Sequence, residues 1–308
     1  MIEEIESHGW KQNLRIRAGG FELVITLDVG PRIIRYAFED GDNVFKEMKA
    51  ELGGRGEDDW KLRGGHRFWA APEGEHCYEP DNGPVSYERD GKRAVIITSP
   101  ESKAYGFRKK LRVAMDKSGG VKVEHELANT GNQELKLAPW GLSVMRPGGV
   151  AIIPQASLGR HPSELPEGVP VVPSAFLPNR NLVLWNYTDL SDPRLELGPS
   201  LWRIHQRAGF PATKIGTFYR GGWVGYQLPG QTFCKKIPVQ KGKPYPDGGS
   251  NLEVFTNPEI LEIESLAPAV PIEPGGAVTH TEKWKLFSQH EPLDNPDRVQ
   301  GFFSQLEV

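Results

Sequence analysis

Cysteine is almost absent from this sequence. Of 308 residues only two are cysteines, Cys77 and Cys234, which are too few to hold a chain of this length together by disulfide bonds. Neither belongs to a Cys-x-x-Cys pair of the kind that binds zinc or performs redox chemistry. We therefore predict two free thiols.

Long hydrophobic runs and an excess of either charge are also missing. No apolar stretch approaches the roughly 20 residues that span a bilayer, and the acidic start of the chain lacks the features of a signal peptide. The 37 basic and 40 acidic residues leave a net charge of −3, which offers no general attraction for nucleic acid or an anionic membrane. We expect a cytoplasmic protein without nucleic-acid or membrane partners.

Cofactor motifs are missing as well. No P-loop, GxGxxG or GxSxG occurs in a suitable context, so we expect no cofactor. One short segment does contain residue types that bind metals, but their spacing matches no established ligand pattern, and we expect no metal site there. These residues are His66, Glu73, Glu75, His76 and Cys77.

The chain is rich in glycine, proline and alternating polarity. The 35 Gly and 26 Pro residues indicate many tight turns. Apolar and polar residues alternate from end to end, most clearly from Val121 to Leu127, and hairpin signals such as Arg89-Asp90-Gly91-Lys92 separate these runs. The pattern predicts about fifteen antiparallel strands, and hence an all-β fold of two large stacked sheets.

Residues 1–308 are predicted to form one domain, because strand patterning continues unchanged after the Pro-rich segment 161–178. That segment is expected to be a long ordered loop on the surface. One helix is predicted near the C-terminus, at 298–306, with Asn295 or Asp297 as its N-cap.

Three glutamates lie on two neighbouring predicted strands near the end of the chain. Glu253 belongs to the first strand, and Glu262 and Glu264 belong to the second. Since side chains alternate along a strand, Glu262 and Glu264 share one face of the sheet. Acids placed in this way form either a solvated outer surface or the floor of a polar groove.

A second candidate segment follows a Gly pair early in the chain. It contains His66, Arg67 and Trp69, and Asp81 follows shortly after. Arginine and aspartate hydrogen-bond vicinal hydroxyls, and an aromatic face packs on the C–H face of a pyranose, so these residue types are typical of sugar sites. The alternative is a packed loop in which Arg67 pairs with a structural carboxylate and Trp69 fills the core.

The order of these features resembles the galactose mutarotase-like (aldose 1-epimerase-like) superfamily, in particular its uncharacterised bacterial branch. The resemblance covers nearly the whole chain. It rests on the opening run LVITLDVGPRII at 23–34, on the Gly-Gly-His-Arg segment at 64–67, on LANTG at 127–131 followed by LAPWGL at 137–142, and on LEIESL at 261–266 followed by EPGG at 273–276.

The resemblance implies a β-supersandwich that interconverts sugar anomers by two proton transfers. In the family, a glutamate on the strand before the last Pro-Gly turn takes the proton from the anomeric hydroxyl, while a histidine protonates the ring oxygen. The glutamate falls at Glu264 or, with a two-residue shift, at Glu262, and an arginine that holds sugar hydroxyls falls at Arg67. The histidine position is filled by Pro139 or Trp140, and a second early histidine, which falls near Asp81, is missing too.

These features favour an isomerase for a hexose or hexose derivative, with Glu264 as base, His66 as acid and Arg67 as a clamp on the hydroxyls. The residues expected to bind the sugar are Arg67, Trp69, Asp81, Trp140, Asp247, Glu253 and Glu262. A carbohydrate-binding protein without catalytic activity is the first alternative, favoured by the missing histidine. The second is an oligosaccharide lyase or hydrolase that uses Glu253 and Glu264 as a carboxylate pair.

Overall fold

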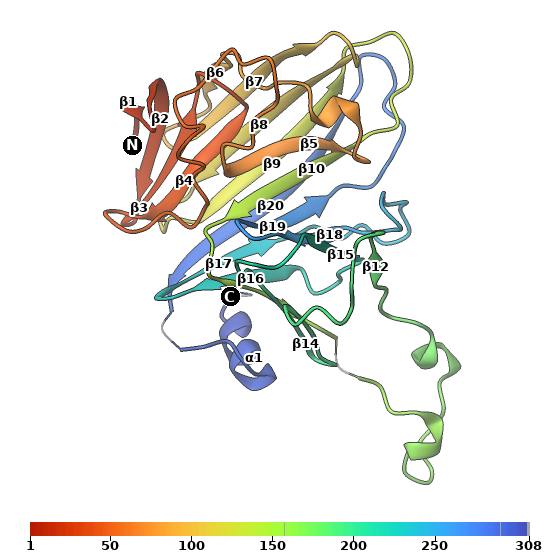
Figure 1. Cartoon of the computed structure of the whole chain (residues 1–308). Helices are drawn as coiled ribbons and strands as arrows, with labels where there is room; N and C mark the ends of the chain where they lie inside the picture. The colour runs from red at the N-terminus through yellow and green to blue at the C-terminus, as the bar shows by residue number, and fades with distance from the viewer. Residues whose placement is uncertain (157, 290, 307–308) are drawn as a thin grey trace.

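Two antiparallel sheets of ten strands each are stacked to form the body of the protein (Figure 1). The structure is a computed structural model that describes residues 1–156, 158–289 and 291–306. The predicted all-β fold of two large sheets is confirmed, with twenty strands in these residues where the sequence indicated about fifteen. Cys77 and Cys234 are free thiols, as predicted, and both are buried.

The first sheet has the strand order β1-β2-β3-β4-β5-β10-β19-β18-β15-β12. Its strands are β1 Ile2–Ser7, β2 Trp10–Ala18, β3 Phe21–Thr26, β4 Arg32–Phe38, β5 Gly65–Ala71, β10 Ala138–Met145, β12 Val183–Leu184, β15 Thr213–Thr217, β18 Leu252–Thr256 and β19 Leu261–Leu266.

The second sheet has the order β13-β14-β11-β16-β17-β20-β9-β8-β7-β6. Its strands are β6 Ser86–Arg89, β7 Ala94–Ser102, β8 Phe107–Met115, β9 Val121–Asn129, β11 Val150–Pro154, β13 Leu195–Leu197, β14 Leu201–His205, β16 Trp223–Leu228, β17 Gln231–Lys236 and β20 Ala277–Ser288. The helical elements are the 3-10 turns η1 Glu75–Cys77, η2 Pro162–Glu164 and η3 Pro173–Phe176, and the helix α1 Pro296–Ser304.

Aromatic side chains from both sheets meet in the core. Tyr36 and Phe45 pack against Phe233 of β17 and Trp284 of β20, with ring centroids 5.6 to 6.3 Å apart. Edge-on pairs of this kind contribute roughly 0.5–1.5 kcal/mol each beyond the burial of their area. The inward-facing side of each sheet is therefore fixed by packing, and the opposite side is left for other roles.

Several local predictions can be compared with the structure. The C-terminal helix is confirmed, with Asn295 as its N-cap: its side-chain oxygen accepts a hydrogen bond from the backbone N–H of Arg298 at 3.0 Å. In the segment 181–187, only Val183 and Leu184 form a strand, which pairs with β15. Within the described residues, no helix is both long and apolar enough to cross a membrane.

Candidate functional site

A cavity of about 440 Å³ lies on the outer face of the first sheet, the face turned away from the second sheet. We call it the outer-face cavity. Its size falls in the range of roughly 300–1,000 Å³ that is usual for small-molecule sites. The charged and aromatic side chains that line its floor are Arg67, Trp69, Trp140, Lys214, Glu262 and Glu264.

Strand register places the floor residues side by side. Arg67 of β5 lies opposite Leu142 of β10, Leu142 lies opposite Glu264 of β19, and Glu264 lies opposite Glu253 of β18. Residues directly across from one another in a sheet point to the same face. The residues that alternate with them along each strand, such as Ile263 of β19, point into the core instead. The alternation in the sequence therefore predicted correctly which glutamates share a face.

A lysine links two of these carboxylates. The Nζ atom of Lys214 on β15 lies 2.7 Å from Oε2 of Glu253 and 2.9 Å from Oε2 of Glu264. The ammonium also lies over the rings of Trp140 and Trp185, at 4.8 and 4.7 Å from their centroids. All three charged side chains are almost completely buried, so these contacts act with little screening by water.

One buried ammonium faces two buried carboxylates, and each group shifts the pKa of the others. Burial disfavours the charged form of Lys214, but Glu264 and Glu253 more than compensate and raise its pKa. Burial raises the pKa of Glu253 well above its usual value, although Lys214 opposes this shift. Burial also raises the pKa of Glu264, again against Lys214. Lys214 therefore holds its proton more tightly than a free lysine does, while burial disfavours the anionic form of both glutamates.

Glu264 keeps one oxygen for a ligand. Its Oε2 atom accepts hydrogen bonds from Lys214 and from the indole Nε1 of Trp140, the latter at 3.1 Å. Its Oε1 atom is buried and has no hydrogen-bond partner in the described part of the chain. A buried acceptor of this kind gains a partner when a donor such as a hydroxyl binds beside it.

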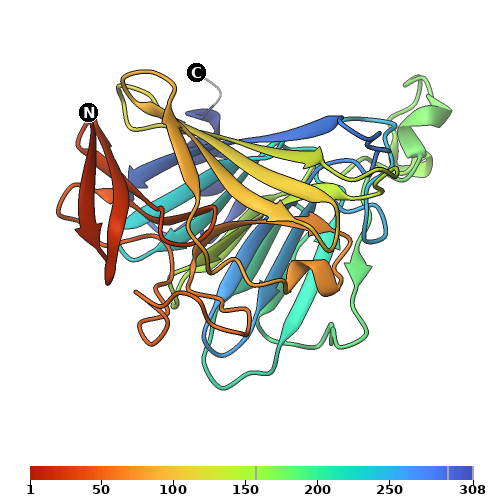
Figure 2. The same ribbon diagram turned by 90° about the horizontal axis from the view of Figure 1, so that it is seen from above.

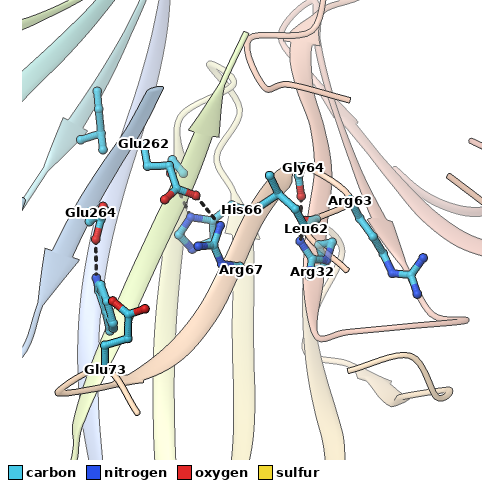
Figure 3. A network of polar contacts seen from close by, with 12 residues as sticks. Arg32, Leu62, Arg63, Gly64, His66, Arg67, Glu73, Glu262 and Glu264 are labelled. Atoms are coloured by element: carbon cyan, nitrogen blue, oxygen red, sulfur yellow. Dashed lines mark hydrogen bonds and ion pairs between the residues drawn. The ribbon is translucent and has the colours of Figure 1, made fainter. Parts of the chain in front are cut away.

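Arg67 forms a second ion pair on the floor of the cavity. Its Nη1 atom lies 2.6 Å from Oε1 of Glu262 (Figure 3). The guanidinium lies 4.3 Å from the ring centroid of Trp69 and 5.5 Å from that of Trp60. Both members of the ion pair are largely buried, so the planar fork of Arg67 is held in one orientation by stacking and by hydrogen bonding.

His66 lies on the other side of the sheet from Glu264, which corrects its predicted position in the site. It directly precedes Arg67 on β5, and neighbouring residues of a strand point to opposite faces. Its Nδ1 contacts Ser143 Oγ at 2.9 Å and its Nε2 contacts His125 Nε2 at 2.7 Å, in the core between the sheets. An imidazole in this place cannot reach a ligand in the outer-face cavity.

Three other residues that were predicted to bind the sugar do not line the cavity. Asp81 pairs with Arg32, whose Nη2 lies 2.9 Å from its carboxylate, and Arg32 also donates to the carbonyls of Leu62 and Gly64. Asp81 therefore supports the loop before β5 and does not line the cavity floor. Glu253 pairs with Lys214 at 2.7 Å, and neither Glu253 nor Asp247 is among the residues that line the cavity.

Sequence reasoning missed Lys214 and the residues at the mouth of the cavity. Glu73, Tyr78 and Tyr187 line it from loops. Lys214 had a usable signal, because it directly precedes Ile215 on β15 and therefore points to the face opposite that buried residue. The loop residues had no such signal, since irregular backbone has no period from which a facing direction follows.

The core beneath the site contains a cluster with metal-binding residue types. Ligand atoms of His66, His125 and Glu282 lie within 4.8 Å of one another. The 2.7 Å between the two histidine nitrogens is a hydrogen-bond distance, shorter than the roughly 3.3 Å between two nitrogens on one tetrahedral zinc ion. The ammonium of Lys235, 3.0 Å from Glu282, already balances the carboxylate. These contacts describe a hydrogen-bonded network that joins the two sheets.

Solved structures of known proteins share this architecture. A galactose mutarotase-like protein from Lactobacillus casei superposes with a TM-score of 0.55 over 89% of this chain and 100% of its own, at 11% identity. A galactose mutarotase-like protein from Clostridium acetobutylicum gives a TM-score of 0.52 over 94% and 99%, at 14% identity. A TPR-domain containing protein from Parabacteroides distasonis gives 0.58 over 92% of this chain, at 13% identity, and this chain spans only 48% of its length.

These similarities define the fold of the chain as galactose mutarotase-like, which confirms the resemblance seen in the sequence at the level of architecture. No family model matches the sequence, and no curated protein matches it. Identities this low carry information about the fold and leave function to the site itself.

Proposed function

We propose that the outer-face cavity binds a saccharide and that Glu264 acts there as a general base in an aldose 1-epimerase-like reaction. The observation that carries the proposal is the unpaired Oε1 atom of Glu264, buried in a cavity whose other floor groups are Arg67, Lys214, Glu262 and two indoles. Trp69 and Trp140 hold the cationic groups of Arg67 and Lys214 at the floor of the cavity, and the fixed guanidinium of Arg67 offers donors to the hydroxyls of a sugar.

The proposed reaction consists of two proton transfers. Glu264 takes the proton of the anomeric hydroxyl while the ring oxygen gains a proton, the bond between that oxygen and the anomeric carbon breaks, and reclosure on the other face gives the second anomer. With His66 in the core, the proton for the ring oxygen comes from the ammonium of Lys214, which contacts the same carboxylate. On reclosure the ring oxygen returns its proton to Lys214 and Glu264 returns its proton to the anomeric oxygen, so the cycle balances.

The experiment is anomer interconversion followed by NMR, on freshly dissolved hexoses, for the wild type and Glu264→Gln. We expect the wild type to accelerate interconversion of at least one sugar and the variant to lose about 10²-fold or more of that acceleration. Glu126→Gln, which changes a glutamate on the surface of β9, is the matched control and should keep the wild-type rate. Equal rates for the wild type and Glu264→Gln would remove Glu264 from the mechanism.

A second candidate function is saccharide binding without turnover. It is favoured by the pKa of Lys214, which its two carboxylate partners raise, because an ammonium that holds its proton more tightly is a weaker acid. Calorimetric binding of a sugar that the protein does not interconvert would select this function.

The carboxylate-pair hydrolase has less support from the geometry. Glu253 and Glu264 contact the same ammonium and lie on adjacent strands, instead of facing one another across the cavity. A glycosidase needs its two carboxyl groups on either side of the bond that it breaks.

A further inference from the structure

The exposed apolar side chains of this protein are concentrated in one stretch. Of the eleven large apolar side chains that are exposed in the described part of the chain, nine lie between Leu158 and Leu190, and Met1 and Tyr78 are the other two. Residues 158–178, which we call the arm, project away from both sheets in Figure 1, and the view from above in Figure 2 agrees. Apolar side chains gathered on a projecting segment mark an interaction surface.

The arm has the composition of a segment that binds in an extended conformation. It contains five prolines, and Pro170 and Pro173 enclose Val171 and Val172 in a PxxP pattern. Val171 and Val172 expose 53% and 55% of their surface. The backbone is extended on both sides of η3, with φ −100° and ψ 103° at Val172. Such segments bind grooves lined by aromatic rings at little cost in conformational entropy.

A groove of that kind begins where the arm leaves the body. It has a volume of about 830 Å³, and Ala156 and Arg180, which flank the arm in sequence, lie at its edge. We call it the arm groove. Its aromatic lining comes from the segment after β15, from the start of β16 and from α1: Phe218, Tyr219, Trp223 and Phe303. It is separate from the outer-face cavity.

An unpaired donor points to a ligand in the arm groove. Trp223 is 4% exposed, and its indole Nε1 has no hydrogen-bond partner in the described residues. A buried indole N–H normally has an acceptor. A backbone carbonyl of a bound proline-rich segment supplies one, because such an extended segment makes no internal hydrogen bonds.

The charges on the two surfaces are complementary. Arg220 lines the arm groove, is exposed, and stacks over Phe218 with its guanidinium 5.5 Å from the ring centroid. The arm carries Arg160 near its start and the acidic Glu164 and Glu167 beyond it, all three exposed. Asp297 at the start of α1 is the acidic residue among those that line the groove.

We propose that the arm groove binds the arm of a second copy of this chain, so that two copies exchange arms about a two-fold axis. Because each arm starts at the edge of its own groove, one rotation brings each arm to the groove of the other copy, and the two contacts are identical. In this arrangement Trp223 donates to a carbonyl of the arm, Val171 and Val172 leave the solvent, and Arg220 approaches Glu164 and Glu167.

The test measures the mass of the full-length protein by light scattering and its dimer dissociation constant by analytical ultracentrifugation. We expect a dimer for the wild type and a monomer for the double variant Val171→Asp with Val172→Asp. Trp223→Phe keeps the ring but removes the donor, so it should weaken the dimer about tenfold. The control is Ser86→Asp with Thr279→Asp, which places the same charges at exposed strand positions elsewhere and should leave the dimer intact.

Complementation makes the test independent of folding defects. The arm variant has an intact groove, and Phe303→Ala has an intact arm, so mixing the two should give heterodimers held by one remaining contact. Arg220→Glu should weaken the dimer, and combining it with Glu164→Arg and Glu167→Arg should restore it.

A wild-type protein that stays monomeric throughout the micromolar range overturns the proposal. A monomeric wild type overturns the proposal even if a synthetic peptide of residues 162–178 binds to the arm groove, because the groove would then serve a proline-rich ligand of other origin. A dimer that survives both the arm substitutions and the groove substitutions overturns it as well.

Discussion

Lys214 and Glu264 are joined across an intervening strand: the ammonium on β15 lies 2.9 Å from the carboxylate on β19, and β18 runs between them. The contact passes over the outer face of the sheet and also includes Glu253 of β18. Three strands are thereby fixed relative to one another at the point where the saccharide is proposed to bind.

Lys214→Met should destabilise the protein strongly. The change leaves Glu253 and Glu264 buried without a cation, and losing one partner of a buried ion pair costs about 3–5 kcal/mol. Urea unfolding followed by circular dichroism measures the loss. Lys110→Met is the matched control, since its pair with Glu126 is more than one-third exposed, and it should cost at most about 1 kcal/mol. Similar losses for the two variants would contradict the assignment of charge to Lys214.

Trp140→Phe should raise the pKa of Glu264 further. The phenyl ring fills most of the indole's place, but the hydrogen bond from Nε1 to Glu264 Oε2 is lost, and this bond favours the ionised carboxylate. A hydrogen bond to a charged group is worth about 1.5–3 kcal/mol. Carbon-13 NMR of labelled glutamate, assigned with Glu264→Gln, follows the titration. An unchanged or lower pKa would show that the indole does not hold the anion.

Arg67→Lys should weaken sugar binding more than it weakens the fold. A lysine preserves the charge opposite Glu262 but lacks the planar group that stacks on Trp69 at 4.3 Å. We expect at least a tenfold higher dissociation constant in calorimetric titration with whichever sugar binds the wild type. Arg108→Lys, on the exposed surface of β8, is the control. Wild-type affinity in Arg67→Lys would rule out its role as a clamp.

Acid should unfold this protein through its buried histidines. Burial holds the pKa of His125 and of His280 at about 3 in the folded chain, below the ordinary value of 6.5. As the pH falls below 6.5, the unfolded chain takes up protons that the folded chain does not. The contribution of these two histidines to the free energy of unfolding is therefore fully present above pH 6.5 and is lost progressively toward pH 3. Each histidine contributes a slope of about 1.4 kcal/mol per pH unit.

Urea unfolding at several pH values between 7 and 5 measures that slope. Most carboxylates titrate at lower pH and contribute little there. His280→Gln should reduce it, while His161→Gln, at an exposed position, should leave it unchanged. A wild-type slope in His280→Gln would mean that the acid sensitivity arises elsewhere.

Alternation along strands predicted a large part of this site, and its neglect produced the main error. Alternation places Glu262 and Glu264 on one face and the apolar Ile263 between them on the other, and the structure agrees. The same rule applies to His66 and Arg67, which are neighbours on β5 and therefore had to face opposite ways. Placing both residues in the sugar site overlooked this relationship.

Other features depend on distance in space and could not be predicted from the sequence. Lys214 is 39 residues from Glu253 along the chain, and only the strand order β15-β18-β19 brings them together. The raised pKa of Glu253 depends in turn on its burial in the assembled sheet. No local pattern encodes such a sum of contacts, because charge and burial are set by the assembled sheet.

The alternation of β5 also limits how the cavity adapts to what it binds. A displacement of Arg67 would carry along His66, whose ring is anchored to the opposite sheet through His125. The base of the cavity is therefore a rigid template, and induced fit is confined to the exposed side chains at its entrance, Glu73, Tyr78 and Tyr187. Substitutions at those three positions would alter selectivity with the least loss of stability, because they can change without disturbing the interior of the sandwich.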